Sequence, residues 1–161
     1  MTTLLTSGTH RSIILETCMT LPVDHLRRYY DGLVTNDPSA KTYALSLWAD
    51  DCILHVPGHN RFSGAHLGKA WMAQDYIPVL ATQGTVRQKE EYFSLVGDDR
   101  YGLSHYRETF ALPEIGETLV AIRHALYEFD GDSIVSIRVF EADETAADTF
   151  FNAYFPADAD D

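Results

Sequence analysis

The sequence predicts an α+β domain shaped as a cone-like roll, with three N-terminal helices packed in a curved antiparallel sheet. Apolar residues recur at helical spacing through the first half of the chain, and from Thr85 they recur at every second residue. The turns after Thr85 also have the chemistry of β-hairpins. Because long strands with one apolar face must bury it, we expect the sheet to curl around the helices and enclose a cavity.

Proline and short polar residues mark where the predicted helices begin. Pro22 suits the first turn of a helix because its φ is fixed near the helical value. Asp37 then acts as N-cap, and Pro38 as first residue, of a second helix that carries Ala44 and Trp48 on one face. The three predicted helices span 22–35, 38 to about 48, and about 66–82.

The predicted strands are mostly long and follow one another directly. A short strand at 52–56 ends at Pro57-Gly58, between the second and third helices. The later strands are 85–96, 101–112, 117–129 and 133–141, and an amphipathic segment at about 144–155 closes the domain. The turns between these strands are Gly97-Asp98-Asp99, Pro113-Glu114-Ile115-Gly116 and Asp130-Gly131-Asp132.

The chain is expected to form one domain, since its 161 residues lie in the usual range of ~100–200 for a single domain. We assign residues 1–20 to an N-terminal arm, 21–155 to the domain and 156–161 to an acidic tail. The two cysteines, Cys18 and Cys52, lack C-x-x-C spacing, which fits reduced thiols in a cytoplasmic protein.

The net charge of −12 excludes several classes of partner. It is concentrated in residues 81–161, which hold 17 acidic and 6 basic side chains. Such a surface repels phosphate backbones and anionic lipids, so we expect no nucleic-acid partner and no membrane partner. No apolar run approaches the ~20 residues that a membrane-spanning helix needs.

Short motifs follow one another in a recognisable order along residues 22–151. They are Arg28-Tyr29, Ala49-Asp50-Asp51, His55-Val56-Pro57-Gly58, Phe62-Ser63-Gly64 with Gly68, Tyr127-Glu128-Phe129-Asp130-Gly131 with Ile134-Val135, and Arg138-Val139-Phe140. Together they resemble the nuclear-transport-factor-2-like (NTF2-like) superfamily, and within it the SnoaL-like polyketide cyclases and the ketosteroid isomerases. This resemblance implies a cofactor-free cyclase or isomerase of secondary metabolism, such as antibiotic biosynthesis, that acts on an apolar polyketide-like molecule. It also implies a homodimer that pairs through the outer face of the sheet.

The resemblance can be followed at three positions. Tyr29 matches the tyrosine with which ketosteroid isomerases stabilise an oxyanion on the first helix. Val56 stands where those enzymes have their general base, and Ala125 stands near the position of their second acid. The loss of both carboxylates favours ring closure by positioning, a pericyclic closure included, over proton shuttling.

The strand at 117–129 offers two further candidate catalytic residues. Arg123 lies between small residues that leave room for a ligand, and it could instead form an ion pair with Glu108. His124 could act as a general base near neutral pH. Because adjacent strand residues face opposite sides, at most one of the two lines the cavity, and the face that includes Ala125 favours Arg123. His55 is a weaker candidate, since it should point away from the side of Val56.

Large apolar residues supply the predicted binding surface for the substrate. The residues assigned to this surface are Trp48, Val56, Phe62, Trp71, Tyr76, Tyr106, Ala125 and Phe140. His55, His59 and His66 lack a nearby cysteine or carboxylate pattern, so no metal site is expected. The glycines at 58, 64 and 68 lack the G-x-G-x-x-G spacing of a phosphate-binding loop.

Two other functions remain open at this point. A hydrolase like the limonene-epoxide hydrolases would need an arginine flanked by two carboxylates that hold a water molecule. The nearest set is Arg107 or Arg123 with Glu108 or Glu128. The alternative from a different class is a non-catalytic binding or dimerisation module, whose cavity would be filled by its own aromatic side chains.

Overall fold

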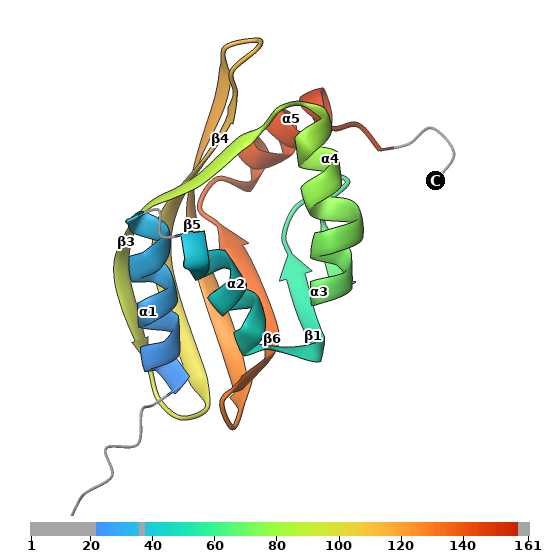
Figure 1. Ribbon diagram of the computed structural model, residues 1–161. Helices are drawn as coiled ribbons and strands as arrows, with labels where there is room; N and C mark the ends of the chain where they lie inside the picture. The colour runs from blue at the N-terminus through green and yellow to red at the C-terminus, as the bar shows by residue number, and fades with distance from the viewer. Residues whose placement is uncertain (1–21, 36–37, 158–161) are drawn as a thin grey trace, which may run out of the picture.

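Apart from the strand β2, helices and strands follow one another along the chain in the order that the residue spacing predicts (Figure 1). The structure is a computed structural model that describes residues 22–35 and 38–157. Its elements are α1 (Pro22–Val34), α2 (Pro38–Leu47), β1 (Trp48–Val56), β2 (Gly64–Leu67), α3 (Gly68–Trp71), the π-helical turn η1 (Met72–Tyr76), α4 (Ile77–Thr82), β3 (Val86–Gly97), β4 (Tyr101–Leu112), β5 (Glu117–Asp130), β6 (Ser133–Glu141) and α5 (Glu144–Tyr154). The predicted α+β class is confirmed, and none of the described helices combines the length and hydrophobicity needed to cross a membrane.

The strands form one curved sheet in the order β2-β1-β6-β5-β4-β3 (Figure 1). The chain passes from β1 through the helical segment to β3 at the far edge, and then returns strand by strand until β6 lies beside β1. All neighbours are antiparallel except β1 and β6, which run parallel. The prediction of a wholly antiparallel sheet was therefore wrong for this one pair.

Three boundaries differ from the prediction, and each difference has a tertiary cause. Trp48 is the first residue of β1 and is not helical, and its pairing with Ile134 of β6 accounts for this. Residues 64–67 form the edge strand β2, which pairs with β1 along Ile53–Val56. The helical segment therefore begins at Gly68, two residues later than predicted, and runs through α3, η1 and α4. The predicted N-cap Asp37, the arm at 1–20, Cys18 and the end of the tail lie outside the described residues.

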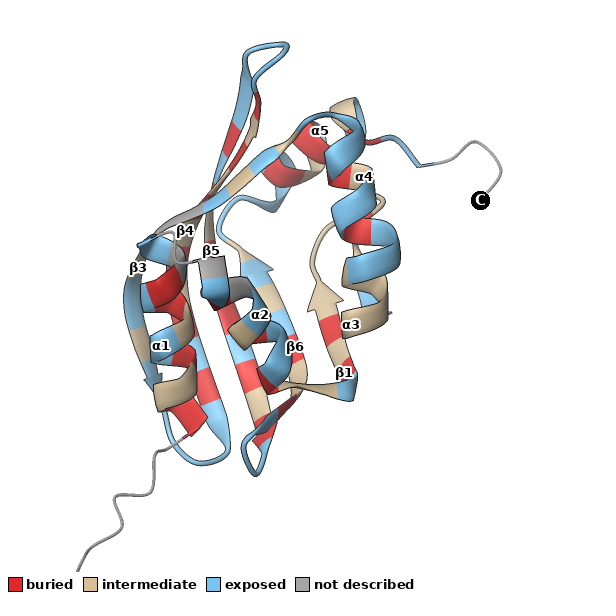
Figure 2. Ribbon diagram, in the orientation of Figure 1, coloured by how far each residue is buried: buried red, intermediate tan, exposed pale blue. Residues whose placement is uncertain are grey.

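The two faces of the sheet have opposite character. Along β5 every second residue from Leu119 to Phe129 is buried, while Val120 and Leu126 between them are exposed (Figure 2). The buried face is the concave one, and it packs against the helices in two apolar clusters. One cluster centres on Leu26 and Tyr30 of α1, and the other centres on Phe62 together with Phe151 of α5. The functional site must be sought where these two clusters meet the concave face.

Candidate functional site

A cavity lies between the concave face of the sheet and the helices. Its deeper part, here called the inner cavity, has a volume of about 110 Å³. A second space of about 320 Å³, here called the vestibule, adjoins it and includes the exposed residues Leu45 and Ile77 in its lining. The two spaces share the lining residues Tyr29, Ala44, Trp48, Met72, Tyr76 and Arg87. The two spaces are thus continuous, and the vestibule is the one that reaches exposed residues.

Most of the predicted binding surface lines the inner cavity. The residues that do so are Trp48, Val56, Phe62, Trp71, Tyr76, Tyr106 and Ala125. Phe140 does not, because it pairs with His124 on the outer face of the sheet and is 45% exposed. Its assignment to the substrate surface is corrected here: the alternation along β6 places Val139, and not Phe140, on the concave side.

Tyr29 of α1 lines both the inner cavity and the vestibule. Burial, and then the nearby Tyr127, raise the pKa of its hydroxyl well above the usual value. The phenol therefore stays protonated at neutral pH and keeps an O–H group that can donate a hydrogen bond. Its ring rests against that of Tyr30, with 5.2 Å between the ring centroids, which fixes its direction.

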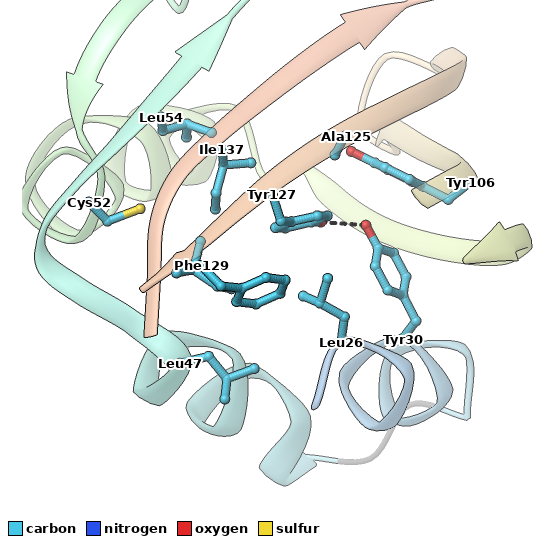
Figure 3. Close-up of a cluster of buried hydrophobic side chains, with 11 residues drawn as sticks. Leu26, Tyr30, Leu47, Cys52, Leu54, Tyr106, Ala125, Tyr127, Phe129 and Ile137 are labelled. Carbon is cyan, nitrogen blue, oxygen red and sulfur yellow. Dashed lines mark hydrogen bonds between the residues drawn. The ribbon is translucent and has the colours of Figure 1, made fainter. Parts of the chain in front are cut away.

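A second tyrosine donor is supported by a buried chain of hydroxyl groups. Tyr127 of β5 lines the inner cavity, and its hydroxyl lies 2.6 Å from that of Tyr30 (Figure 3). The Tyr30 hydroxyl is also 2.8 Å from the Ser104 Oγ atom, and both residues are fully buried. Burial raises the pKa of Tyr127 to about 12, so this hydroxyl too remains protonated at neutral pH.

Four charged side chains form a buried network on the concave face. Glu108 lies between two arginines: its Oε2 is 2.7 Å from Arg123 Nη1, and its Oε1 is 2.7 Å from Arg87 Nε. Arg123 is also paired with Glu141 through both Nε and Nη2. The network holds two positive and two negative groups, and balanced pairing is what permits charges to be buried at this depth.

The environment of the network raises the pKa of three of its members. Burial is the largest single influence on Arg123 and lowers its pKa, but Glu108, Tyr106, Glu141 and Tyr76 together raise it by more, so the net pKa lies above the usual value. Arg87 behaves in the same way, because Glu108 together with nearby tyrosines outweighs burial. Burial raises the pKa of Glu141 more than Arg123 lowers it, so Glu141 binds a proton more readily than an exposed glutamate does.

The remaining predicted catalytic residues are separated by the sheet. Arg123 lines the inner cavity, whereas His124 lies on the outer face and stacks on His105 with 4.4 Å between ring centroids. His55 of β1 pairs with Ala65 and Arg138 and lines neither the inner cavity nor the vestibule. A direct role in the cavity is therefore withdrawn for His124 and His55, because strand alternation turns both away from it.

Sequence reasoning missed Arg87, Tyr127 and Glu141. Arg87 precedes two irregularities in the pairing of β3 with β4, so simple alternation along β3 could not assign its face. Glu141 comes opposite Arg123 only because β5 and β6 pair in this register. Tyr127 belongs to the same odd-numbered face as Arg123, and that alternation was a usable signal.

Three described side chains that could together hold a metal ion lie away from the cavity. His59 Nδ1 is 3.8 Å from Glu144 Oε1 and 3.7 Å from Asp148 Oδ2. Both oxygens of Asp148 already accept the backbone N–H of His59, and Oδ1 also accepts from Asn60. The cluster is accounted for as the contact that holds the loop after β1 against α5.

Comparison with solved structures identifies the fold. A protein of unknown function with a cystatin-like fold, from Xanthomonas campestris, matches with a TM-score of 0.68 and 22% identity over 82% of this chain and 98% of that chain. An NTF2-like protein from Burkholderia thailandensis has a TM-score of 0.62 and 14% identity over 84% and 96% of the two chains. TerC, crystallised with polyporic acid, has a TM-score of 0.62 and 13% identity over 81% and 96%.

Other matching structures, from Pseudomonas putida and Xanthomonas campestris, are described as candidate polyketide cyclases. A scan of protein-family models finds no match to the chain, and a search of curated proteins finds none either. The chain therefore has the NTF2-like fold, and it shares that fold with proteins described as candidate cyclases of small molecules.

The buried network generates a prediction about stability. Replacing Glu108 by Gln should lower the free energy of unfolding by about 3 to 5 kcal/mol, because the buried Arg123 and the partly buried Arg87 then share no carboxylate between them. The matched control is Glu128→Gln on β5, whose side chain is 40% exposed and 3.7 Å from Arg100, and it should cost under about 1 kcal/mol. Urea unfolding measures both. Equal losses would show that the network does not stabilise the fold.

Proposed function

We propose that this protein is a cofactor-free cyclase or isomerase of secondary metabolism that acts on an apolar, polyketide-like small molecule. One observation carries the proposal: hydrogen-bond donors from Tyr29, Arg87 and Tyr127 adjoin a cavity whose other walls are aromatic and aliphatic apart from Arg123, which is paired with Glu108 and Glu141. Such a concave site with few polar groups is typical of small-molecule binding. The vestibule alone reaches the lower end of the ~300–1,000 Å³ range of ligand pockets.

The proposed mechanism uses positioning and hydrogen-bond donation. The cavity holds the apolar skeleton in a folded shape, and the Tyr29 hydroxyl donates to a carbonyl oxygen on which negative charge develops. Burial keeps that hydroxyl protonated, so the donor is in place before the reaction begins. Val56 and Ala125 line the inner cavity without offering a carboxylate, which favours ring closure or rearrangement over proton shuttling. These reactions neither add nor remove electrons, so the proposal requires no cofactor.

A specific observation also favours a second candidate, hydrolysis of an epoxide. Arg123 is flanked by two carboxylates, Glu108 and Glu141, as that chemistry requires. However, Glu141 lines neither the inner cavity nor the vestibule, so only one of the two carboxylates adjoins a bound molecule. Arg107 and Glu128, the other pair considered, lie on the outer face. The cyclase or isomerase is therefore the favoured proposal.

A non-catalytic binding module would have a cavity filled by its own side chains, and here an inner space of about 110 Å³ remains between them. We place the reaction in the cytoplasm, where the buried free thiol of Cys52 stays reduced.

Ligand binding can be read from the protein's own fluorescence, because both tryptophans of the chain, Trp48 and Trp71, line the inner cavity. Titration with polyporic acid should quench their emission. Ala125→Phe should abolish the quenching, since the added ring occupies the inner cavity. In the Leu126→Phe variant the same ring lies on the outer face, so this variant should bind polyporic acid as the wild type does. Equal quenching of both variants would place the ligand outside the cavity.

The type of reaction can be read from the mass of the product. The protein is incubated with an extract from polyketide-producing bacteria, and compounds consumed by the wild type are compared with those consumed by Tyr29→Phe. The product should have the same mass as its precursor, and Tyr29→Phe should slow its formation about 100-fold, since one donor to the developing charge is lost. A product heavier by one water would favour the hydrolase. If the protein consumes no compound, the non-catalytic binding module becomes the favoured function.

We also propose that a second copy of the chain covers the outer face of the sheet. Exposed apolar residues gather there, including Phe93, Leu103, Val120, Leu126 and Phe140. Because each copy carries a net charge of −12, most surfaces of two copies repel each other. The outward residues of β4 include no acid, and those of β5 include none between Thr118 and Leu126. This is the face at which two copies can approach with the least repulsion.

Sedimentation velocity tests this association. The wild type should sediment as a dimer, and Phe140→Asp should shift it toward a monomer because it buries an unpaired charge in the interface. Ile115→Asp alters a somewhat more exposed apolar residue in the β4–β5 turn and should leave the dimer intact. A monomeric wild type, or equal effects of both variants, would contradict the proposed interface.

A further inference from the structure

Two buried polar atoms at the vestibule have no hydrogen-bond partner among the described residues. They are Thr85 Oγ1 and Arg87 Nε, two residues apart where α4 gives way to β3. Both residues line the vestibule. The backbone N–H of Thr85 donates to the Leu80 carbonyl at 3.2 Å, so the position of Thr85 is fixed. Buried polar groups are nearly always paired, so Thr85 Oγ1 lacks an expected partner here, whereas Arg87 Nε keeps an ion-pair contact with Glu108 Oε1.

The two arginines of the buried network differ in how their donors are used. Arg123 donates to Glu108 and Glu141, and to the Tyr76 hydroxyl, so its guanidinium is occupied. Arg87 is paired with Glu108 alone, through Nε at 2.7 Å, in a geometry that makes an ion pair but not a hydrogen bond. Its terminal nitrogens form no hydrogen bond to the described residues. Arg87 therefore retains donors for a ligand, whereas Arg123 does not.

Arg87 is held in a position that faces the ligand. Its guanidinium carbon lies 5.2 Å from the centre of the Tyr76 ring and 5.7 Å from that of Phe110. The side chain nevertheless remains 32% accessible, because it borders both the inner cavity and the vestibule. Two aromatic faces thus orient a planar fork of N–H groups toward open space.

A guanidinium can only donate hydrogen bonds, so the ligand group that it meets must accept them. Two arginines adjoin the two spaces, but only one carboxylate does, since Glu141 lines neither. Glu141 compensates Arg123 from outside the two spaces, and the two arginines share Glu108, so an acceptor that is itself negative would complete the pairing of Arg87. The planar fork suits a group with two neighbouring oxygens, such as a carboxylate or an ionised hydroxyl beside a carbonyl.

We propose that Arg87 and Thr85 form a recognition site for an acidic oxygen group on the substrate, either a carboxylate or the enolate of a hydroxyquinone. The apolar body of the same molecule fills the inner cavity. This inference rests on the proposed function, because it names the class of molecule that the cavity accepts: an apolar skeleton with one acidic end at the vestibule.

Calorimetric titration at neutral pH tests the inference with two probes. Polyporic acid carries ionisable hydroxyl groups beside quinone carbonyls, and its dimethyl ether has the same skeleton without them. The wild type should bind the acid about tenfold more tightly than the ether, as a charge-assisted hydrogen bond provides. Arg87→Met should remove this preference and leave the affinity for the ether unchanged, and Thr85→Val should reduce it severalfold.

Two further variants keep the result interpretable. Arg107→Met makes the same substitution on the outer face and should retain the preference for the acid. Arg87→Lys keeps the charge without the planar fork, so it should fold as the wild type does while losing part of the preference. Equal binding of both probes by the wild type would overturn the inference and leave cavity binding intact. Failure of both probes to bind would overturn the proposed function, and the inference with it.

Discussion

The buried pairing of Glu108 with two arginines is the constraint on which the concave face depends. Each buried charge costs several kcal/mol of desolvation unless a partner compensates it, so the four members must stay in contact. They come from four adjacent strands, with Arg87 on β3, Glu108 on β4, Arg123 on β5 and Glu141 on β6. A slip of one residue in any pairing would turn one member to the outer face and leave its partner uncompensated. The network therefore fixes the register of this half of the sheet.

The same network divides the cavity chemically. Both guanidinium groups lie over the ring of Phe110, which is fully buried, with Arg123 at 5.0 Å from its centre and Arg87 at 5.7 Å. The inner cavity has charged and hydroxyl-bearing residues on β3 and β5, and apolar ones such as Trp71, Leu54 and Ile137 elsewhere. Under the proposed function, this difference in polarity would orient a bound molecule, with its oxygen-bearing end toward β3 and its skeleton toward β1 and β6.

The sequence was a good guide wherever a local pattern decides the structure. Alternation along β5 separated Arg123 from His124 correctly, and helical spacing with Pro22 located α1. The sequence was a poor guide where contact with a distant segment of the chain decides the structure. The strand β2 exists because β1 offers it an edge, and Glu141 meets Arg123 because of the register between β5 and β6. Arg87 was missed because the bulges of β3 obscure its alternation. The polar part of the site is made of such long-range contacts, so its apolar lining was easier to foresee.

The central claim is that the cavity binds an apolar molecule with its oxygen-bearing end against Arg87 and Tyr29. A crystal structure of the complex with polyporic acid tests this most directly. The account predicts the rings of the ligand between Trp48 and Trp71 in the inner cavity, and a ligand oxygen within hydrogen-bond distance of the Arg87 guanidinium. An empty cavity with ligand on the outer face of the sheet, or a ligand whose oxygens point away from Arg87, would contradict it.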